Sequence, residues 1–363
     1  MTVTVVAVAA VAIGGFVASR RTPESQAGAA APLVAPVRTP SPLTFTGAKV
    51  VPIDAAKLPV GDAPHLTYLR DRTVHGGAGT PVKVPGSVEI DAVARLHDAV
   101  LTIQLKTVRD PALVILDASG KQIERVPLVD SLVTSTDGQA AAYASGGRYT
   151  TEGKLGDGGT VYYRRSAPGP VKQLAQPKVF DLRVLGVSND TVYFQSSDDS
   201  AGPWNFYRWQ VDQPTPTRIS SVRSPIAVSG DGTLVAGLVS QNDSGMCTTL
   251  MTATTGSQRW RSCQYQLTRF SPGNTFTIGI PAGSDPYGDL ENVALDPKTG
   301  DQLRKWTGPS LRDARPEDGD HVVLAWHDRP EPGSRSALVR CTVSSGKCEL
   351  ATPLASGTLL LGS

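Results

Sequence analysis

The chain has 363 residues, and its 35 Lys and Arg against 33 Asp and Glu give a formal net charge of +2 at pH 7. This balance excludes the strongly basic surface that nucleic-acid binding requires. With 36 Gly and 28 Pro, and no long amphipathic helical pattern after the first residues, the composition favours an all-β domain with many tight turns.

The chain begins with an apolar stretch. Residues 2–19 carry no charge, and Arg20 and Arg21 end the run. This length is near the lower limit for a membrane-spanning helix, so we expect a single-pass anchor at residues 1–21, with a cleaved signal peptide as the alternative. Residues 22–44 are rich in Ala, Pro, Ser and Gly, and predict a flexible linker that lifts the next domain off the membrane.

Residues 45–363 contain a repeated pattern of strands and turns. In the clearest unit, residues 289–306, two alternating segments flank a turn that ends at Gly300, as in a β-hairpin with Gly in the left-handed conformation. Related turns end at residues 79, 120, 169, 216, 256, 300 and 346, so the intervals are 41, 49, 47, 40, 44 and 46 residues. A short polar turn upstream of each hairpin adds two further strands per unit. This period, with four strands per unit, predicts a β-propeller.

The number of hairpin turns predicts seven blades in residues 45–363, or six if residues 45–85 do not form one. Residues 357–361 lie where the first strand of a further unit would begin. A terminal strand that completes the first blade would close the ring without leaving free strand edges.

The four cysteines fall into two close pairs on different hairpins. If the Gly256 hairpin has a three-residue loop, Cys247 faces Cys263; if the Gly346 hairpin has a two-residue loop, Cys341 faces Cys348. Cross-strand neighbours lie within disulfide reach, so we predict two disulfides, with four unbonded buried cysteines as the alternative. Disulfides persist in oxidising compartments. The two arginines after the anchor favour a cytoplasmic domain, but long domains can be exported regardless of flanking charge. We therefore expect a cell-membrane protein with its propeller on the extracytoplasmic side.

The loops between the second and third strands of the units lie on one face of a propeller. They differ in length, and each contains an aspartate that could bind a cation, an amine or sugar hydroxyls. Exposed aromatic residues in the same loops suit sugar or peptide recognition. The alternative is that each aspartate stabilises its own loop through hydrogen bonds to the backbone. The candidate ligand-binding residues are Asp198, Asp199, Trp204, Asp285, Tyr287, Asp289 and Asp328.

Two His-Asp neighbours, at positions 97–98 and 327–328, invite an acid/base interpretation. Adjacent residues of a strand point to opposite faces, so neither pair is expected to make the required contact. The five histidines show no metal-ligand spacing, and the sequence contains no phosphate loop and no hydrolase nucleophile elbow. We therefore assign no catalytic residue and expect neither a metal nor a cofactor.

Residues 295–300 with Trp306 resemble the repeat of quinoprotein-like and outer-membrane-assembly propellers, and residues 229–232 resemble the short turn of TolB-type and WD-like propellers. This resemblance implies an exported bacterial propeller. Quinoprotein-like enzymes use a calcium-bound quinone and typically a disulfide between adjacent cysteines, and no two cysteines are adjacent here. We expect a membrane-tethered, non-catalytic binding or scaffold module for a cell-envelope protein or glycan. The alternative is a propeller enzyme, glycoside-active or quinone-dependent, that uses loop aspartates.

Overall fold

The computed structural model describes residues 43–107, 109–146, 158–177, 179, 181–197, 204–242, 245–284, 289–331 and 333–362. The predicted anchor and almost all of the predicted linker lie outside these residues. Within them, no helix has the length and apolar character needed to span a membrane.

The described chain is built from sheets whose strands are antiparallel, as predicted, except for one short parallel pairing near residue 50. In four of the five four-stranded sheets, the strands pair in chain order. The first two sheets are β29 (Leu359–Leu361), β2 (Tyr68–Arg70), β3 (Thr73–His75) and β4 (Val82–Lys83), then β5 (Glu89–Leu96), β6 (Ala99–Leu105), β7 (Pro111–Leu116) and β8 (Gln122–Pro127). The C-terminal strand β29 pairs with β2, so the strands nearest the two ends of the described chain share one sheet, as the closure argument predicted.

Three further four-stranded sheets follow in chain order. They are β9 (Val129–Thr134), β10 (Ala141–Ser145), β11 (Gly159–Arg164) and β12 (Val171–Gln176); β13 (Asp181–Ser188), β14 (Thr191–Ser197), β15 (Asn205–Gln210) and β16 (Thr217–Arg223); and β17 (Pro225–Val228), β18 (Leu234–Asn242), β19 (Gly245–Thr252) and β20 (Gln258–Ser262).

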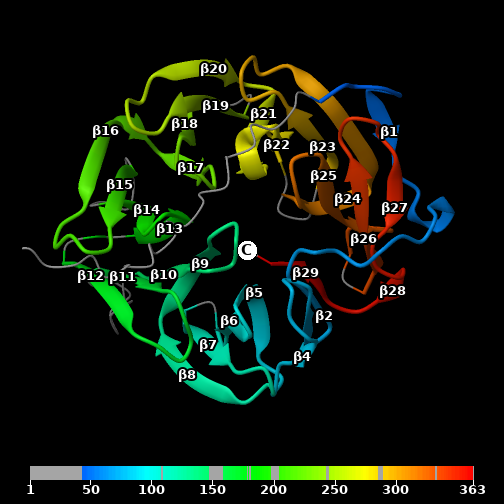
Figure 1. Cartoon of the computed structure of the whole chain (residues 1–363). Helices are drawn as coiled ribbons and strands as arrows, with labels where there is room; N and C mark the ends of the chain where they lie inside the picture. Colours follow the sequence, from blue (N-terminus) through cyan, green and yellow to red (C-terminus); the bar gives the residue numbers. More distant parts are fainter. Residues whose placement is uncertain are drawn as a thin grey trace, which may run out of the picture. The chain divides into compact units, whose positions relative to one another are not determined.

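The last sheet has nine strands because β24 is shared between two sets of strands. The path runs through β21 (Tyr265–Phe270), β22 (Thr277–Pro281), β23 (Asp289–Leu295), β24 (Gln302–Pro316), β25 (His321–His327), β26 (Arg335–Thr342) and β27 (Cys348–Leu350), with β28 (Ala355–Ser356) on β26 and β1 (Val50–Pro52) on β24. The first half of β24 pairs with β23, whereas its second half pairs with β25. Figure 1 shows the sheets following one another around a central axis, with β5, β9, β13, β17 and β21 on the inner side.

The hydrophobic core lies between neighbouring sheets. All six residues of β7 are buried, because this strand lies between its two neighbours within the sheet and is covered on both faces. Outermost strands such as β8 alternate between exposed and half-buried residues. Trp260, Trp306 and Trp326, predicted to pack between repeats, are 9%, 0% and 5% exposed. The Trp260 indole donates to the carbonyl of Pro297 in the next hairpin, at 3.1 Å, and thereby links two units.

The hairpin turns have the predicted chemistry. In the turn before β24, the Gly300 N–H donates to the Asp296 carbonyl at 2.8 Å, and Gly300 has φ of +81°, a conformation that glycine adopts without steric cost. The corresponding Gly346 has φ of +74° and donates to Thr342 at 2.8 Å. The repeat in the sequence therefore reflects a repeated backbone geometry.

Both predicted disulfides are present, joining Cys247 to Cys263 and Cys341 to Cys348. The predicted register holds at Cys341 and Cys348, which are direct cross-strand partners. The predicted two-residue loop of this hairpin is wrong, because Thr342 pairs with Lys347 and leaves four residues in the loop. The predicted three-residue loop of the Gly256 hairpin is also wrong: Thr252 pairs with Ser257, and an irregularity next to Leu250 restores the register that brings the first pair together.

A segment that the sequence left without a pattern, residues 43–65, forms a strap along the outer edge of the sheets. Its strand β1 pairs in parallel with β24, and Val60 forms a bridge with Leu350 of β27. Two buried arginines hold the strap. Arg304 donates to the Thr46 carbonyl at 2.8 Å, and Arg340 donates to the carbonyls of Asp62 and Ala63, both at 3.0 Å. The strap covers strand edges that would otherwise be free to pair with other chains.

Candidate functional site

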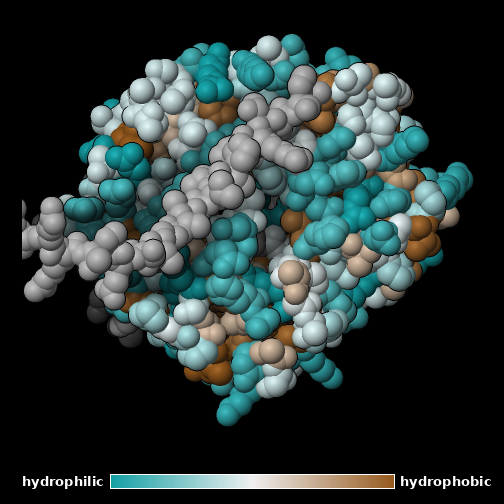
Figure 2. Space-filling view, viewed as in Figure 1, coloured by the Kyte–Doolittle hydropathy of each residue, from teal (hydrophilic) through white to brown (hydrophobic). Residues whose placement is uncertain are grey.

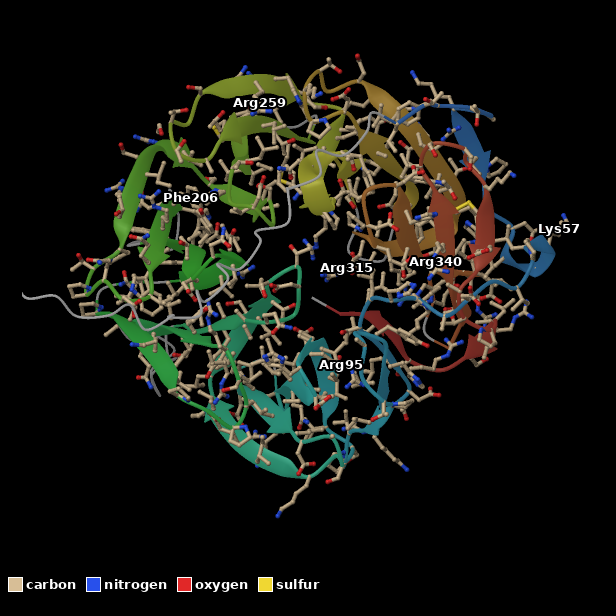
Figure 3. The ribbon with its side chains drawn as sticks, viewed as in Figure 1. Lys57, Arg95, Phe206, Arg259, Arg315 and Arg340 are labelled. Carbon is tan, nitrogen blue, oxygen red and sulfur yellow. A yellow bond between two sulfur atoms is a disulfide. The ribbon has the colours of Figure 1, made fainter. Side chains whose placement is uncertain are left out.

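A cavity of about 370 Å³ opens at the centre of the ring. It is lined by residues of the inner strands β5, β9, β13, β17, β21 and the second half of β24. Figure 3 labels Arg315 at the inner edge of the ring, beside the central opening. We call this cavity the central channel. Because its lining comes from successive repeats, residues at the same position in different units face one another across it.

The channel has two chemically different ends. The last residues of β9, β21 and β24 line one pocket together with the turns that follow them, so the carboxyl ends of the inner strands meet there. We call this end, lined by residues 134–136, 269–272 and 315–317, the turn mouth. Asp130 and Asp181 stand near the beginnings of β9 and β13, and a strand rises about 3.3 Å per residue. Asp130 therefore lies about 13 Å from the level of Thr134 along the strand. We call the end at Asp130 and Asp181 the loop mouth.

The turn mouth contains two arginines from neighbouring inner strands. Arg269 of β21 and Arg315 of β24 line both the channel and the pocket of about 200 Å³ at its end. Arg315 forms an ion pair with Asp313 at 3.0 Å, and Arg269 donates to the Thr268 carbonyl at 2.8 Å. The positive charge of Arg315, with burial, lowers the pKa of Arg269 to about 10, and Asp313 offsets only part of this effect.

The loop mouth is acidic. Burial of the carboxyl group, followed by the negative charge of Asp181, raises the pKa of Asp130 to about 6, while Arg183 acts in the opposite direction. Asp181 accepts a hydrogen bond from the Leu182 N–H at 2.8 Å and forms an ion pair with Arg183 at 3.3 Å. Asp130 is nevertheless open to water inside the channel. Its carboxyl group can therefore exchange a proton near neutral pH.

A second cavity of about 550 Å³ lies beside the turn mouth, with His65, Arg95, His97 and Asp137 in its lining. Several of its polar groups already have structural partners. Asp137 accepts from the Ser135 hydroxyl at 2.6 Å, His97 Nε2 donates to the Arg165 carbonyl at 2.9 Å, and Arg95 donates to the Thr80 carbonyl at 2.6 Å. These polar groups of the second cavity therefore already serve the fold.

Of the predicted ligand-binding residues, Asp198, Asp199, Asp285 and Tyr287 lie outside the described residues, as does the side chain of Asp289. The backbone of Asp289 begins β23 and pairs with Leu311, so its assignment to a loop is wrong. Trp204 is half-buried, directly before β15. Asp328 accepts from the Arg335 N–H at 3.0 Å and from its guanidinium at 3.1 Å, which lowers the pKa of its carboxyl group. Asp328 thus stabilises its own hairpin.

The two histidines considered for acid/base chemistry, His97 and His327, lie in hairpins of different sheets and have different surroundings. His97 follows β5 in the turn before β6, and His327 ends β25, before the connection to β26. His327 is buried, and its Nδ1 lies 3.1 Å from the Ser334 hydroxyl. Burial lowers the pKa of His327 to about 4, so this side chain is neutral at pH 7.

The channel residues Asp130, Arg269 and Arg315, and Asp181, whose charge acts on Asp130, were not identified from the sequence. One signal could have identified them. This signal is a charged residue near one end of an inner strand: Asp130 and Asp181 stand near the beginnings of β9 and β13, and Arg269 and Arg315 stand next to last in β21 and β24. A single charged residue within one repeat does not indicate a site. The grouping of these charges at the two ends of the channel is recognised only when equivalent positions of different repeats are compared.

Searches by sequence found neither a matching family model nor a matching curated protein. Searches by structure found similar folds. The uncharacterized protein lmo1340 from Listeria monocytogenes EGD-e aligns with a TM-score of 0.52 and 12% identity over 77% of this chain and 91% of its own. Prolyl oligopeptidase B from Galerina marginata aligns with a TM-score of 0.51 and 9% identity, over 75% of this chain and 43% of the peptidase. TolB from Acinetobacter baumannii aligns with a TM-score of 0.40 and 16% identity over 81% of this chain and 65% of its own.

At identities of 12% and 9%, the similarities to lmo1340 and to the peptidase establish the fold only. The repeated four-stranded antiparallel sheets around a channel, together with the likeness to lmo1340 and the peptidase, define the chain as a β-propeller protein. The chain spans less than half of the peptidase, so that enzyme's activity does not transfer with the fold.

Proposed function

We propose that this chain is a seven-bladed β-propeller, tethered to the cell membrane on its extracytoplasmic side, and that it serves as a non-catalytic binding or scaffold module for a cell-envelope protein or glycan. The blade count follows if the nine-stranded sheet holds two blades. The five four-stranded sheets then add to two sets, β21 to the first half of β24 and the second half of β24 to β27.

The extracytoplasmic position is supported by the disulfides. The described residues contain no free cysteine, and both bonds join neighbouring strands of a single hairpin. Disulfides of this kind are rare in proteins of a reducing compartment. The apolar residues 2–19 and the linker after them supply the tether in this proposal.

The observation that carries the binding role is the central channel. A closed ring is a stiff frame, and here it surrounds a cavity whose two mouths carry opposite charges. Of the described candidate residues of the loop face, Trp204 stands directly before β15 and Asp328 directly after β25. A binding module needs such fixed polar groups around an accessible space, and it needs no catalytic constellation.

Capture of partners from cell-envelope material tests this role. The full-length chain is compared with the variants Asp198→Ala, Trp204→Ala, Asp285→Ala and Tyr287→Ala. Arg259→Ala, on the exposed outer strand β20, is the matched control (Figure 3). We expect an envelope component that binds the purified chain and the control equally and the loop variants less. Unchanged recovery with every loop variant would remove the loop face from the proposal.

A second candidate function rests on the loop mouth. Asp130, which holds a proton up to about pH 6, and its acidic neighbour Asp181 resemble the carboxylate pair with which glycosidases exchange protons. If the protein cleaves an envelope glycan, Asp130→Asn should abolish product release without loss of glycan binding. Equal product release by this variant and the parent chain would eliminate Asp130 as the acid.

A further inference from the structure

The turn mouth carries more positive than negative charge. Arg269 and Arg315 supply two guanidinium groups, and Asp313 is the one described carboxylate that acts on both. Glu317 also lines the pocket, but its carboxylate is held by Arg340, at 2.5 Å from Nε and 3.0 Å from Nη2. The group of two arginines and Asp313 therefore has a net charge of +1, because two positive charges face one negative charge.

The side chains that carry this excess charge are largely shielded from bulk water. The side chain of Arg315 is 17% exposed, and that of Asp313 is 33% exposed. Like charges in such surroundings repel strongly, and the lowered pKa of Arg269 reports this repulsion. An anion placed between the two guanidinium groups would replace repulsion by two attractive contacts.

The pocket has space and further donors for such an anion. Its volume of about 200 Å³ accommodates a small organic acid or a phosphate, and the hydroxyl-bearing residues Thr67 and Thr136 are part of its lining. Arginine is the preferred partner of carboxylates and phosphates in proteins, because its planar group donates two parallel hydrogen bonds to two oxygens. Figure 2 shows that hydrophilic residues cover most of the face viewed, apart from the atoms drawn in grey.

We propose that Arg269 and Arg315 form an oxyanion-binding site at the turn mouth, which holds a small ligand through a carboxylate or phosphate group. Arg315 is positioned by its ion pair with Asp313, and Arg269, which lines the same pocket, is positioned by its hydrogen bond to the Thr268 carbonyl. The site lies at the opposite end of the channel from the loop face. It therefore goes beyond the proposed partner-binding role, and neither proposal depends on the other.

Equilibrium binding of inorganic phosphate and of succinate to the purified full-length chain tests this site. Titrations are made at constant ionic strength, because added salt screens weakly bound charges. The variants are Arg269→Gln and Arg315→Gln, and Arg259→Gln on β20 is the matched control. Affinity tags stay at the N-terminus because Gly362 lines the turn mouth.

We expect saturable binding of at least one probe by the parent chain and the control, and an affinity at least about tenfold lower for each of the two variants. The probe that binds identifies the carboxylate or the phosphate as the recognised group. Arg269→Gln should also melt at the same or a higher temperature than the parent chain without ligand, since it relieves the repulsion from Arg315. That result separates loss of the site from loss of the fold.

Two results would overturn the site: no saturable binding of either probe by the parent chain, or equal affinity in Arg269→Gln and Arg259→Gln. Neither result would affect the capture experiment on the loop face, because that experiment concerns the other end of the channel.

Discussion

Replacing His327 by Gln should remove a large part of the acid sensitivity of the fold. His327 ends β25, its side chain is 6% exposed, and its Nδ1 is held by the Ser334 hydroxyl at 3.1 Å. Burial lowers the pKa of the imidazole from its ordinary 6.5 to about 4, and Arg312 adds to this effect while Asp328 opposes it.

The size of the effect follows from the difference in pKa between the two states. The unfolded chain takes up a proton on His327 below about pH 6.5, whereas the folded chain does so only below about pH 4. The free energy of unfolding therefore decreases as the pH falls through this interval, and the contribution is constant above and below it. A difference of about 2.5 pKa units corresponds to a loss of about 3 kcal/mol.

Urea denaturation near pH 7 and near pH 4 measures this loss for the parent chain and for His327→Gln. Between these pH values, we expect His327→Gln to lose about 3 kcal/mol less stability than the parent chain. If His327→Gln and the parent chain show the same pH dependence, the imidazole is not held neutral by the fold.

Three further changes test other parts of the structure. Replacing Cys247 and Cys263 by Ser removes a disulfide between residues 16 positions apart and should lower the free energy of unfolding by about 3 kcal/mol. Removing the disulfide between Cys341 and Cys348, which are 7 positions apart, should lower it by about 2 kcal/mol. Denaturation with and without reductant measures both, and identical curves would contradict the expectation. Asp130→Asn should stabilise the fold by about 1 kcal/mol above pH 6, a modest value because channel water screens the carboxylate, and should have no effect below pH 4. Denaturation at both pH values measures this, and destabilisation at neutral pH would be the opposite result. Arg304→Ala should cost about 3 kcal/mol and speed hydrogen exchange in residues 46–52, because the guanidinium donates to backbone carbonyls of both the strap and the turn after β26. Unchanged exchange in the strap would show that Arg304 does not hold it.

The sequence predicted what depends on local chemistry. Turns with glycine at positive φ recur along the chain, and Gly120, Gly256, Gly300 and Gly346 adopt that conformation. The cysteine pairs were found because a hairpin turn sets the register of its own strands. Even where the predicted turn before Gly256 was wrong, the nearby irregularity preserved the alignment of Cys247 with Cys263.

The sequence did not predict what depends on contacts between distant segments. The strap at residues 43–65 has no strong pattern of its own, because its backbone is satisfied by Arg304 and Arg340, more than two hundred residues away. The charged residues of the channel were not predicted for the same reason. Arg269 and Arg315 lie in consecutive repeats, and the packing of β21 beside the second half of β24 brings them to one mouth. The loop aspartates could be selected from the sequence, but the carboxylate of Asp328 accepts a hydrogen bond from Arg335 and stabilises its own hairpin.

The redox state of the four cysteines in cells tests most directly whether the propeller domain lies on the extracytoplasmic side of the membrane. Cells that produce the full-length chain are treated with acid, and free thiols are then alkylated before any reduction. Peptides are identified by mass spectrometry. We predict peptides that join Cys247 to Cys263 and Cys341 to Cys348, with no alkylated cysteine. Alkylation of all four cysteines would locate the ring in a reducing compartment and contradict a role in the cell envelope.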